Sequence, residues 1–419
     1  MNVLIKSATI ISPKTAFHNT VQDLLIENGI IKKIATSIKN THNYHLIDYS
    51  NLHVSIGWFD GSVSFGEPGF EERETIDNGL NVAAKSGFTG IALNSDTNPV
   101  VDNKSIIEFL INKSIKTATK LHPIGSLTKN AAGKELTELF DLKNSGAVAF
   151  YDYNKGINNA NLLKIALLYA QSFDGLVMSF PQNNDIAGDG LMNESKQNTL
   201  LGLKGIPNFA EELQIKRDLA LLKYTGGKLH IPTISTAESV MLIKKAKAEG
   251  LKVTCSVSIN NLVLTDEVLH DFNTNYKTLP PLRTKTDQKA LIKGIKEGII
   301  DFIVSDHCPI DIEHKKVEFQ LAKFGSIGLE SFYGALNSIL DLTDFIELIT
   351  INPRKIYNLE IPEIAIEKPA NLTLFNPNAE IIFKENNILS TSKNSALLNQ
   401  KLKGVVYGII ANNQLVLNQ

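Results

Sequence analysis

The side chains with the clearest potential for catalysis lie in the segment Ser305-Asp306-His307-Cys308-Pro309. A carboxylate next to an imidazole can transfer protons or bind a metal ion. Asp306 and His307 are therefore the first candidates for a functional site. The alternative is that both side chains are buried and hydrogen bonded to neighbouring loops, because buried polar groups are ordinarily paired.

The chain is poor in the groups that hold a hydrolytic metal centre. Such a centre needs several histidine or carboxylate ligands around a position open to water. Nine histidines are present, and none of them forms a His-x-His pair. The only cysteines, Cys255 and Cys308, are far apart in sequence. This spacing argues against a disulfide framework or a cysteine zinc site and favours a reducing cytoplasm.

Composition and motifs exclude several other classes of function. The formal net charge of -2 provides no field that would attract a nucleic acid or an anionic membrane. No run of eighteen apolar residues predicts a membrane span, and the first residues do not resemble a secretion signal. The sequence has no Gly-x-Ser-x-Gly elbow, phosphate-binding loop or dinucleotide-binding glycine motif. Small molecules or proteins are therefore the expected partners, and the cytoplasm is the expected location.

The hydrophobic pattern predicts an α/β fold of two parts. Short strands fill residues 1–52, and short strands return over residues 366–419. Between them, apolar β-rich runs alternate with amphipathic helices, which is typical of parallel βα units. Eight such units predict a (β/α)8 barrel over residues 53–365, with a small β-sandwich built from both chain ends. The predicted strands are 54–59, 88–94, 121–127, 147–151, 176–180, 229–234, 253–257 and 302–305; the predicted helices include 106–115, 162–169, 210–222 and 237–249.

Catalytic groups of such a barrel come from the C-terminal ends of its strands. There the sequence resembles bacterial dihydroorotases of the larger, barrel-plus-sandwich type, within the amidohydrolase superfamily. The resemblance runs essentially the full length. It is carried by Glu67-Pro68-Gly69-Phe70, Asp96-Thr97-Asn98-Pro99, Gly205-Ile206-Pro207, Ala210-Glu211-Glu212, Ser235-Thr236, Leu279-Pro280-Pro281-Leu282-Arg283, Ser305-Asp306-His307-Cys308-Pro309 and Phe324-Gly325-Ser326-Ile327-Gly328-Leu329-Glu330. Most of these segments are turns, caps and packing residues.

The resemblance also implies where a metal site would lie, and the chain departs from the family there. Active relatives carry Asp-x-His-x-His-x-Arg-Glu-Pro-Gly after the first strand, with zinc-binding histidines and a substrate-binding arginine. The five positions that match the family's metal ligands are Ser62, Ser64, Tyr153, Phe180 and Thr233. Gly66 stands at the arginine position, and Asp96 and Leu279 stand at asparagine positions. Of the catalytic set only Asp306 remains, which acts in the family as general base and metal ligand.

These departures lead us to expect a catalytically silent relative with no cofactor. A hydroxyl is a poor zinc ligand and a phenyl ring is none, so no water would be activated. Asp306 would be a vestigial base, and Asp96 and His307 would be the remaining substrate-binding residues. The alternatives are an active dihydroorotase, or another cyclic amidohydrolase, with zinc in an atypical site, and a ligand-binding protein that uses the emptied barrel mouth.

The resemblance implies a partner as well. Inactive dihydroorotase homologues in some bacteria assemble with aspartate transcarbamoylase, the preceding enzyme of pyrimidine synthesis. We therefore expect a structural or regulatory complex with that enzyme, and a homodimer is the alternative assembly.

Overall fold

A ring of eight parallel strand segments forms the centre of the computed structural model, which describes residues 1–13 and 15–418. β6 (Trp58–Val63), β7 (Phe88–Leu93) and β8 (Lys120–Pro123) form one part of the ring. β9 (Val177–Met178), β12 (Leu229–Ile231), β13 (Val253–Ser258) and β14 (Phe302–Val304) form another. The fourth segment, at Phe150, is joined to its two neighbours by single parallel bridges to Gly125 and Val177. A parallel bridge between Val63 and His307 closes the ring. The predicted (β/α)8 barrel is confirmed.

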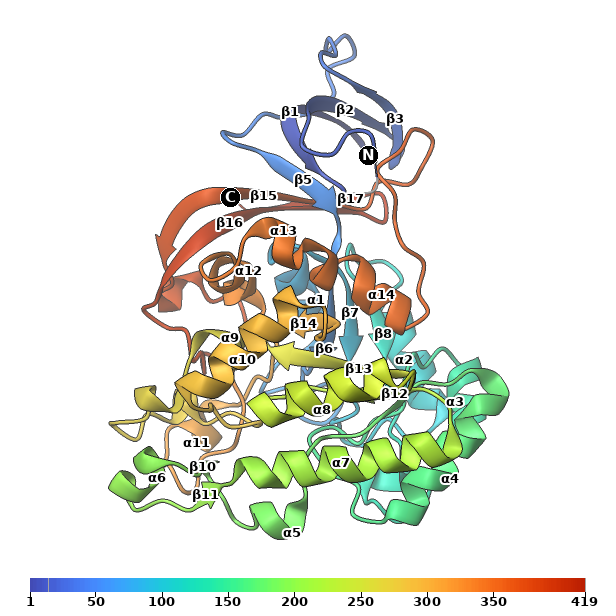
Figure 1. Ribbon diagram of the computed structural model, residues 1–419. Helices are drawn as coiled ribbons and strands as arrows, with labels where there is room; N and C mark the ends of the chain where they lie inside the picture. Colours follow the sequence, from blue (N-terminus) through green and yellow to red (C-terminus); the bar gives the residue numbers. More distant parts are fainter. Residues whose placement is uncertain (14, 419) are drawn as a thin grey trace.

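Helices cover the outside of this ring (Figure 1). They include α1 (Ile76–Lys85), α2 (Lys104–Ser114), α4 (Ala160–Ala170), α7 (Asn208–Thr225), α8 (Ala237–Ala248), α10 (Lys285–Lys296) and α12 (Leu329–Asn337). Side chains at the start of five of them, Thr75, Asn103, Asn159, Thr236 and Thr284, accept hydrogen bonds from the first-turn backbone. Such caps satisfy amide groups that a helix leaves unpaired. The four helices predicted by residue range are therefore present, with ends shifted by a few residues.

Strands from both chain ends join into one eight-stranded sheet. Its order is β17 (Gln414–Leu417), β16 (Lys401–Ala411), β15 (Leu372–Ile382), β5 (His53–Ile56), β1 (Asn2–Ile11), β2 (Val21–Glu27) and β3 (Ile30–Ala35), with β4 (His45–Ile47) paired to β1. This end sheet lies beyond one end of the barrel (Figure 1). The predicted domain made from both ends is therefore present, whereas its limits at residues 52 and 366 stay a prediction.

The first predicted barrel strand, residues 54–59, is divided in the structure. β5 pairs with β1 and β15 of the end sheet, and β6 pairs with β7 of the barrel. Gly57 lies between the two strands, where a Cβ atom would come within 2.1 Å of the Thr89 hydroxyl oxygen. Glycine is required here because the chain passes between the two sheets at very close range.

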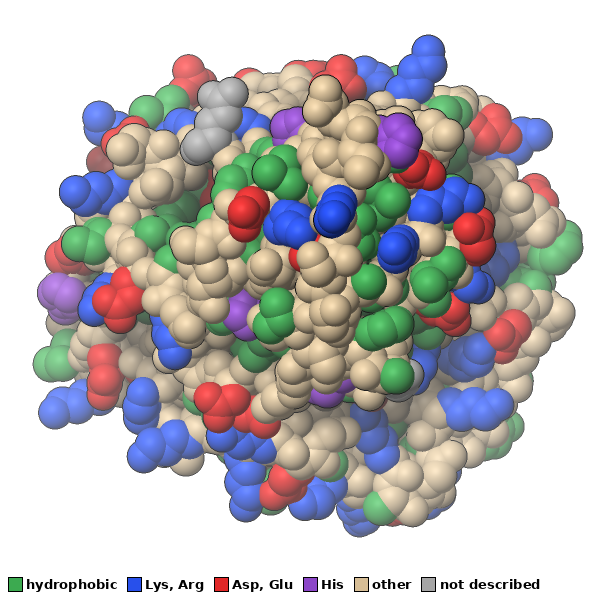
Figure 2. Space-filling view, turned by 90° about the horizontal axis from the view of Figure 1, so that it is seen from above, with side chains coloured by type: hydrophobic (Ala, Val, Ile, Leu, Met, Phe, Trp, Pro, Cys, Tyr) green, Lys and Arg blue, Asp and Glu red, His purple; other side chains and the backbone are tan. Residues whose placement is uncertain are grey.

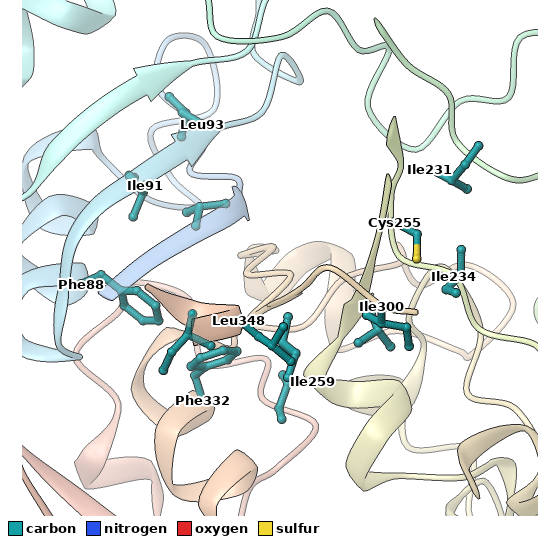
Figure 3. Packing of buried hydrophobic residues seen from close by; sticks show 14 of the residues in the cluster. Phe88, Ile91, Leu93, Ile231, Ile234, Cys255, Ile259, Ile300, Phe332 and Leu348 are labelled. Atoms are coloured by element: carbon teal, nitrogen blue, oxygen red, sulfur yellow. The ribbon is translucent and has the colours of Figure 1, made fainter. Parts of the chain in front are cut away.

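The main core fills the space between the barrel strands and their helices. Figure 3 shows Phe88 and Ile91 of β7, Ile231 of β12 and Phe332 of α12 within this layer. A second core lies in the end sheet and includes Val3, Leu24, Val54, Leu372 and Ile410. Burial of this apolar surface is the main stabilising contribution to both parts of the fold.

The surface carries charges of both signs. Figure 2 views the molecule from the side of the end sheet, and its acidic and basic side chains are interspersed. This face therefore has no extended field of one sign. Among the described residues, no helix combines the length and apolarity needed to cross a membrane.

Candidate functional site at the barrel mouth

Two serines occupy the positions after the first barrel strand where the family resemblance places histidines. Asn94, which follows β7, donates its side-chain amide to Ser62 Oγ at 3.1 Å and to Ser64 Oγ at 3.2 Å. Ser64 Oγ donates in turn to Asp96 Oδ1 at 2.9 Å. Both hydroxyls are buried and engaged by their neighbours. The segment therefore forms a hydrogen-bonded chain in place of a pair of imidazoles.

The other three positions provide no strong metal ligand either. Phe180 is buried in an apolar cluster with Tyr151 and Met178, and Tyr153 packs edge-on against Tyr151 with ring centroids 5.8 Å apart. Thr233 is buried, and its backbone N–H donates to Ser256 Oγ at 3.1 Å. Within residues 1–13 and 15–418, no group of three or more His, Cys, Asp or Glu side chains could hold a metal ion. The donor set at this mouth does not fit a zinc centre.

Buried carboxyl groups gather at the mouth instead. Asp60 accepts the backbone N–H of Ser62 and that of Ser305, each at 3.1 Å, and burial raises its pKa to about 7. Burial, and then the neighbouring Asp60 carboxylate, raise the pKa of Asp306 to about 7. Burial also raises the pKa of Asp96. Asp306 therefore takes up a proton more readily than an ordinary aspartate, because a low-polarity site with like charges disfavours its ionised form.

Several polar atoms at the mouth lack a partner. Thr233 Oγ1, Asp306 Oδ1 and both side-chain amide atoms of Asn260 are buried without a hydrogen bond among the described residues. These side chains follow β12, β13 and β14, so they lie at the same end of the barrel. Water or a small ligand would satisfy them, since unpaired buried polar groups are costly.

His307 is held by a helix N-terminus. Its Nδ1 accepts the backbone N–H groups of Gly328 at 3.1 Å and Leu329 at 3.4 Å, where α12 begins. Because Nδ1 accepts, the ring is neutral, and burial lowers its pKa to about 4. This contact favours a structural role that ties the loop after β14 to α12. Substrate binding by His307 and Asp96 stays a prediction.

Gly66 has a conformational reason to lack a side chain. Its φ is +158°, and a Cβ atom would come within 2.2 Å of the Phe70 carbonyl oxygen. An arginine at this position would have to displace the backbone of the following turn. The conformation of this loop therefore excludes the arginine that the family resemblance implies at position 66.

Two cations near Asp96 were not predicted from the sequence. Arg73 and Lys155 both favour the charged form of Asp96 through their charges. The guanidinium carbon of Arg73 lies 4.0 Å from the centre of the Phe70 ring, and its Nε lies 3.8 Å from Asp311 Oδ2. The sequence predicts that Glu71-Glu72-Arg73-Glu74 begins a helix, but α1 starts only at Ile76. A turn precedes it and directs Arg73 towards the mouth.

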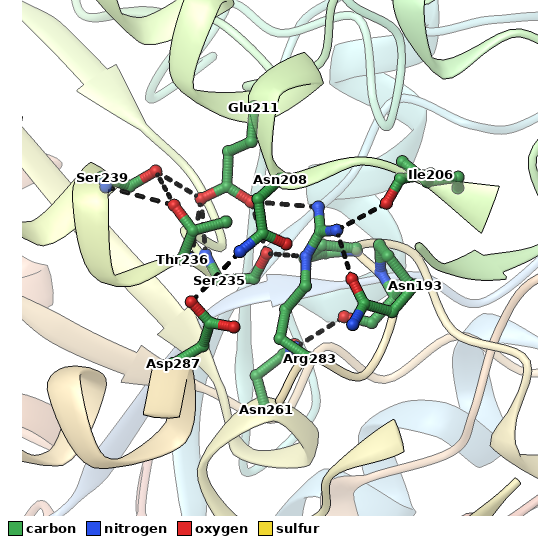
Figure 4. Close-up of polar contacts among 12 residues, drawn as sticks. Asn193, Ile206, Asn208, Glu211, Ser235, Thr236, Ser239, Asn261, Arg283 and Asp287 are labelled. Atoms are coloured by element: carbon green, nitrogen blue, oxygen red, sulfur yellow. Dashed lines mark hydrogen bonds and ion pairs between the residues drawn. The ribbon is translucent and has the colours of Figure 1, made fainter. Parts of the chain in front are cut away.

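The motifs retained from the family meet in a buried polar network formed by the start of α7 and the loops after β9, β12 and β13 (Figure 4). Glu211 accepts the backbone N–H groups of Ser235 at 2.7 Å and Thr236 at 3.1 Å, and also the Ser239 hydroxyl at 2.7 Å. Arg283 Nη2 lies 3.7 Å from Glu211 Oε2. Arg283 also donates to Asn193 Oδ1 at 2.9 Å and the Ile206 carbonyl at 2.8 Å. These motifs therefore fix the loops to one another, as the sequence predicts for residues that preserve the fold.

Solved structures with the same architecture include hydantoinases and dihydropyrimidinases. The L-hydantoinase (dihydropyrimidinase) of Arthrobacter aurescens superposes with a TM-score of 0.86 over 100% of this chain and 96% of that one, at 19% identity. A dihydropyrimidinase of Brevibacillus agri gives a TM-score of 0.83 over 100% and 95% of the two chains, at 20% identity. At this identity the likeness establishes the fold alone.

Comparison of sequences identifies the family as well as the fold. A family model described as dihydro-orotase-like matches residues 53–239. A dihydroorotase of Acetivibrio thermocellus is 38% identical over 100% of this chain and 99% of its own length. A dihydroorotase of Caldicellulosiruptor saccharolyticus is 39% identical over 99% of this chain and 98% of its own. The chain therefore belongs to the dihydroorotase family.

Proposed function

We propose that this dihydroorotase-like protein does not hydrolyse a ring amide and acts instead as a structural or regulatory partner in pyrimidine biosynthesis. The observation that supports the proposal is the chemistry of the five ligand positions. Ser62 and Ser64 hold hydroxyls that Asn94 and Asp96 engage. Thr233 holds a buried hydroxyl without a partner among the described residues, and Tyr153 and Phe180 hold packed aromatic rings. Without a bound metal ion, nothing at the mouth would lower the pKa of a water molecule or polarise a ring carbonyl.

The second candidate is an active dihydroorotase, or another cyclic amidohydrolase, with an atypical site. The names of the full-length relatives favour it, because every one cited above is a dihydroorotase. This candidate requires zinc to be held by a donor set outside the five positions. Turnover by the purified chain separates the two candidates. We expect no hydrolysis of dihydroorotate when zinc is supplied, whereas zinc-dependent turnover would establish the second.

A complex with aspartate transcarbamoylase is the partner proposal. It rests on the family resemblance and on a complete fold around a site poor in ligands, which suggests that surfaces rather than chemistry are maintained. We expect this chain and the aspartate transcarbamoylase of the same organism, mixed at micromolar concentration, to migrate together in size exclusion. The chain alone serves as the control and reports whether it is a homodimer. Separate migration, with no change in the thermal stability of either protein, would contradict the proposal.

A further inference from the structure

A cavity of about 710 Å³ lies at the end of the barrel opposite the mouth, between the barrel and the end sheet. Phe59, Thr89, Lys120 and His122 line it from the first parts of β6, β7 and β8. Residues of the end sheet also line it: Asn28 and Asn413 in turns, and Asn371 directly before β15. It is therefore separate from the site at the C-terminal ends of the strands.

Arg354 places a buried positive charge on the wall of this cavity. It belongs to α14 (Ile351–Ile356) and is 4% exposed. Its Nη1 donates to the Thr350 carbonyl at 2.7 Å, its Nη2 donates to Thr89 Oγ1 at 3.0 Å, and its guanidinium carbon lies 5.3 Å from the centre of the Phe59 ring. No carboxylate of the described residues offsets its charge, and burial lowers its pKa. A buried cation without an acidic partner is costly, because desolvation is not repaid by an opposite charge.

Lys120 adds a second positive charge to the lining, whereas the imidazole of His122 is neutral. His122 packs against Phe59 with ring centroids 5.6 Å apart, and burial and then the charges of Arg354 and Lys120 lower its pKa to about 4. The acidic residues of the lining, Glu360 and Glu363, are exposed at the rim, and Glu363 is paired with Lys368 at 3.3 Å. Water screens charges at the rim far more than the charge of Arg354.

We propose that this cavity binds a small organic anion whose carboxylate or phosphate group pairs with Arg354. The guanidinium has five N–H groups, and two hydrogen bonds occupy only part of this fork. Carboxylate and phosphate oxygens match its geometry, and such charge-assisted bonds are among the strongest in proteins. The side chains of Leu359, Ile361 and Pro369, which also line the cavity, would contact the apolar part of the ligand.

Titration calorimetry of the full chain with inorganic phosphate and, separately, with acetate tests this site. We expect saturable binding of at least one probe at one site per chain, and the tighter probe identifies the oxyanion. Arg354→Gln should weaken binding about tenfold or more, because it removes a charged hydrogen-bond donor. Lys355→Gln, which changes the adjacent exposed residue, should leave binding unchanged.

The imidazole of His122 provides an independent readout. Burial and then the charge of Arg354 lower the pKa of His122. An anion beside Arg354 offsets the second of these causes, so binding should raise that pKa in an NMR titration. The His122→Gln variant identifies the signal. If Arg354→Gln does not fold, Lys120→Gln replaces it and should weaken binding about threefold, since Lys120 lies on an exposed part of the lining. Absence of saturable binding by both probes, or binding that neither variant weakens, would overturn the proposal.

Discussion

Replacement of Glu211 with alanine is expected to lower the free energy of unfolding by about 3 to 5 kcal/mol. Glu211 accepts the Ser235 and Thr236 backbone N–H groups and lies 3.7 Å from the guanidinium of Arg283. Its removal leaves these backbone donors without an acceptor and takes away the carboxylate that is ion-paired with the buried Arg283. The loss therefore exceeds what one neutral hydrogen bond contributes, about 0.5 to 1.5 kcal/mol.

Urea unfolding followed by fluorescence measures this difference, because Trp58 is the single tryptophan and is fully buried. Glu212→Ala is the matched control, since the neighbouring carboxylate is partly exposed and forms no part of the network in Figure 4. The double variant Glu211→Leu with Arg283→Met should lose less stability than the two single variants together, because it removes the unpaired charge. A Glu211→Ala variant as stable as Glu212→Ala would contradict a structural role for these motifs.

Replacing the five residues at the metal-ligand positions with histidine or aspartate is not expected to give the protein dihydroorotase activity. The variant carries Ser62→His, Ser64→His, Tyr153→Asp, Phe180→His and Thr233→His. When this variant takes up zinc, the pocket still lacks the arginine that the family resemblance assigns to the substrate carboxylate, a loss of about 1.5 to 3 kcal/mol. Asp96 adds a negative charge that opposes the same carboxylate by about 1 kcal/mol in a hydrated site and about 4 kcal/mol in a partly dry one.

The structure refines the repair that this pocket would need. Asp96→Asn should improve substrate binding in the zinc-loaded variant, whereas Gly66→Arg should not, because its Cβ would overlap the Phe70 carbonyl oxygen at 2.2 Å. Zinc uptake by elemental analysis and turnover of dihydroorotate are measured on each variant. Zinc uptake with near-normal turnover in the five-residue variant would contradict this account of Gly66 and Asp96.

The fold could be predicted from the sequence because its signals are local. Apolar runs alternate with amphipathic helices eight times along the sequence. The predicted helices 210–222 and 237–249 begin within two residues of the starts of α7 and α8. The division at Gly57 could not be predicted, since apolar residues continue from Val54 to Phe59 and only the contact with Thr89 separates the two strands. The returning segment 366–419, which is predicted to hold only short strands, contains a long strand, β15, with an irregularity between Asn376 and Glu380.

The site could be predicted only as a set of positions. The family motif locates Ser62 and Ser64, but their shared donor, Asn94, comes directly after the next strand and meets them only in the folded barrel. His307 is similar, because its acceptor role depends on a helix that starts more than twenty residues later. Arg354 belongs to no motif in the sequence. Its burial is recognised only in the structure, from its contacts with Thr89 and Phe59.

The zinc content of the purified chain, determined together with its turnover of dihydroorotate, tests the central claim most directly. The chain is dialysed against a weak chelator and analysed for metal, with an intact dihydroorotase treated in the same way as the control. Because the mouth presents hydroxyls and aromatic rings where imidazoles would be required, the account predicts zinc well below one ion per chain and no turnover. One or two zinc ions per chain that survive dialysis, with hydrolysis of dihydroorotate, would contradict it.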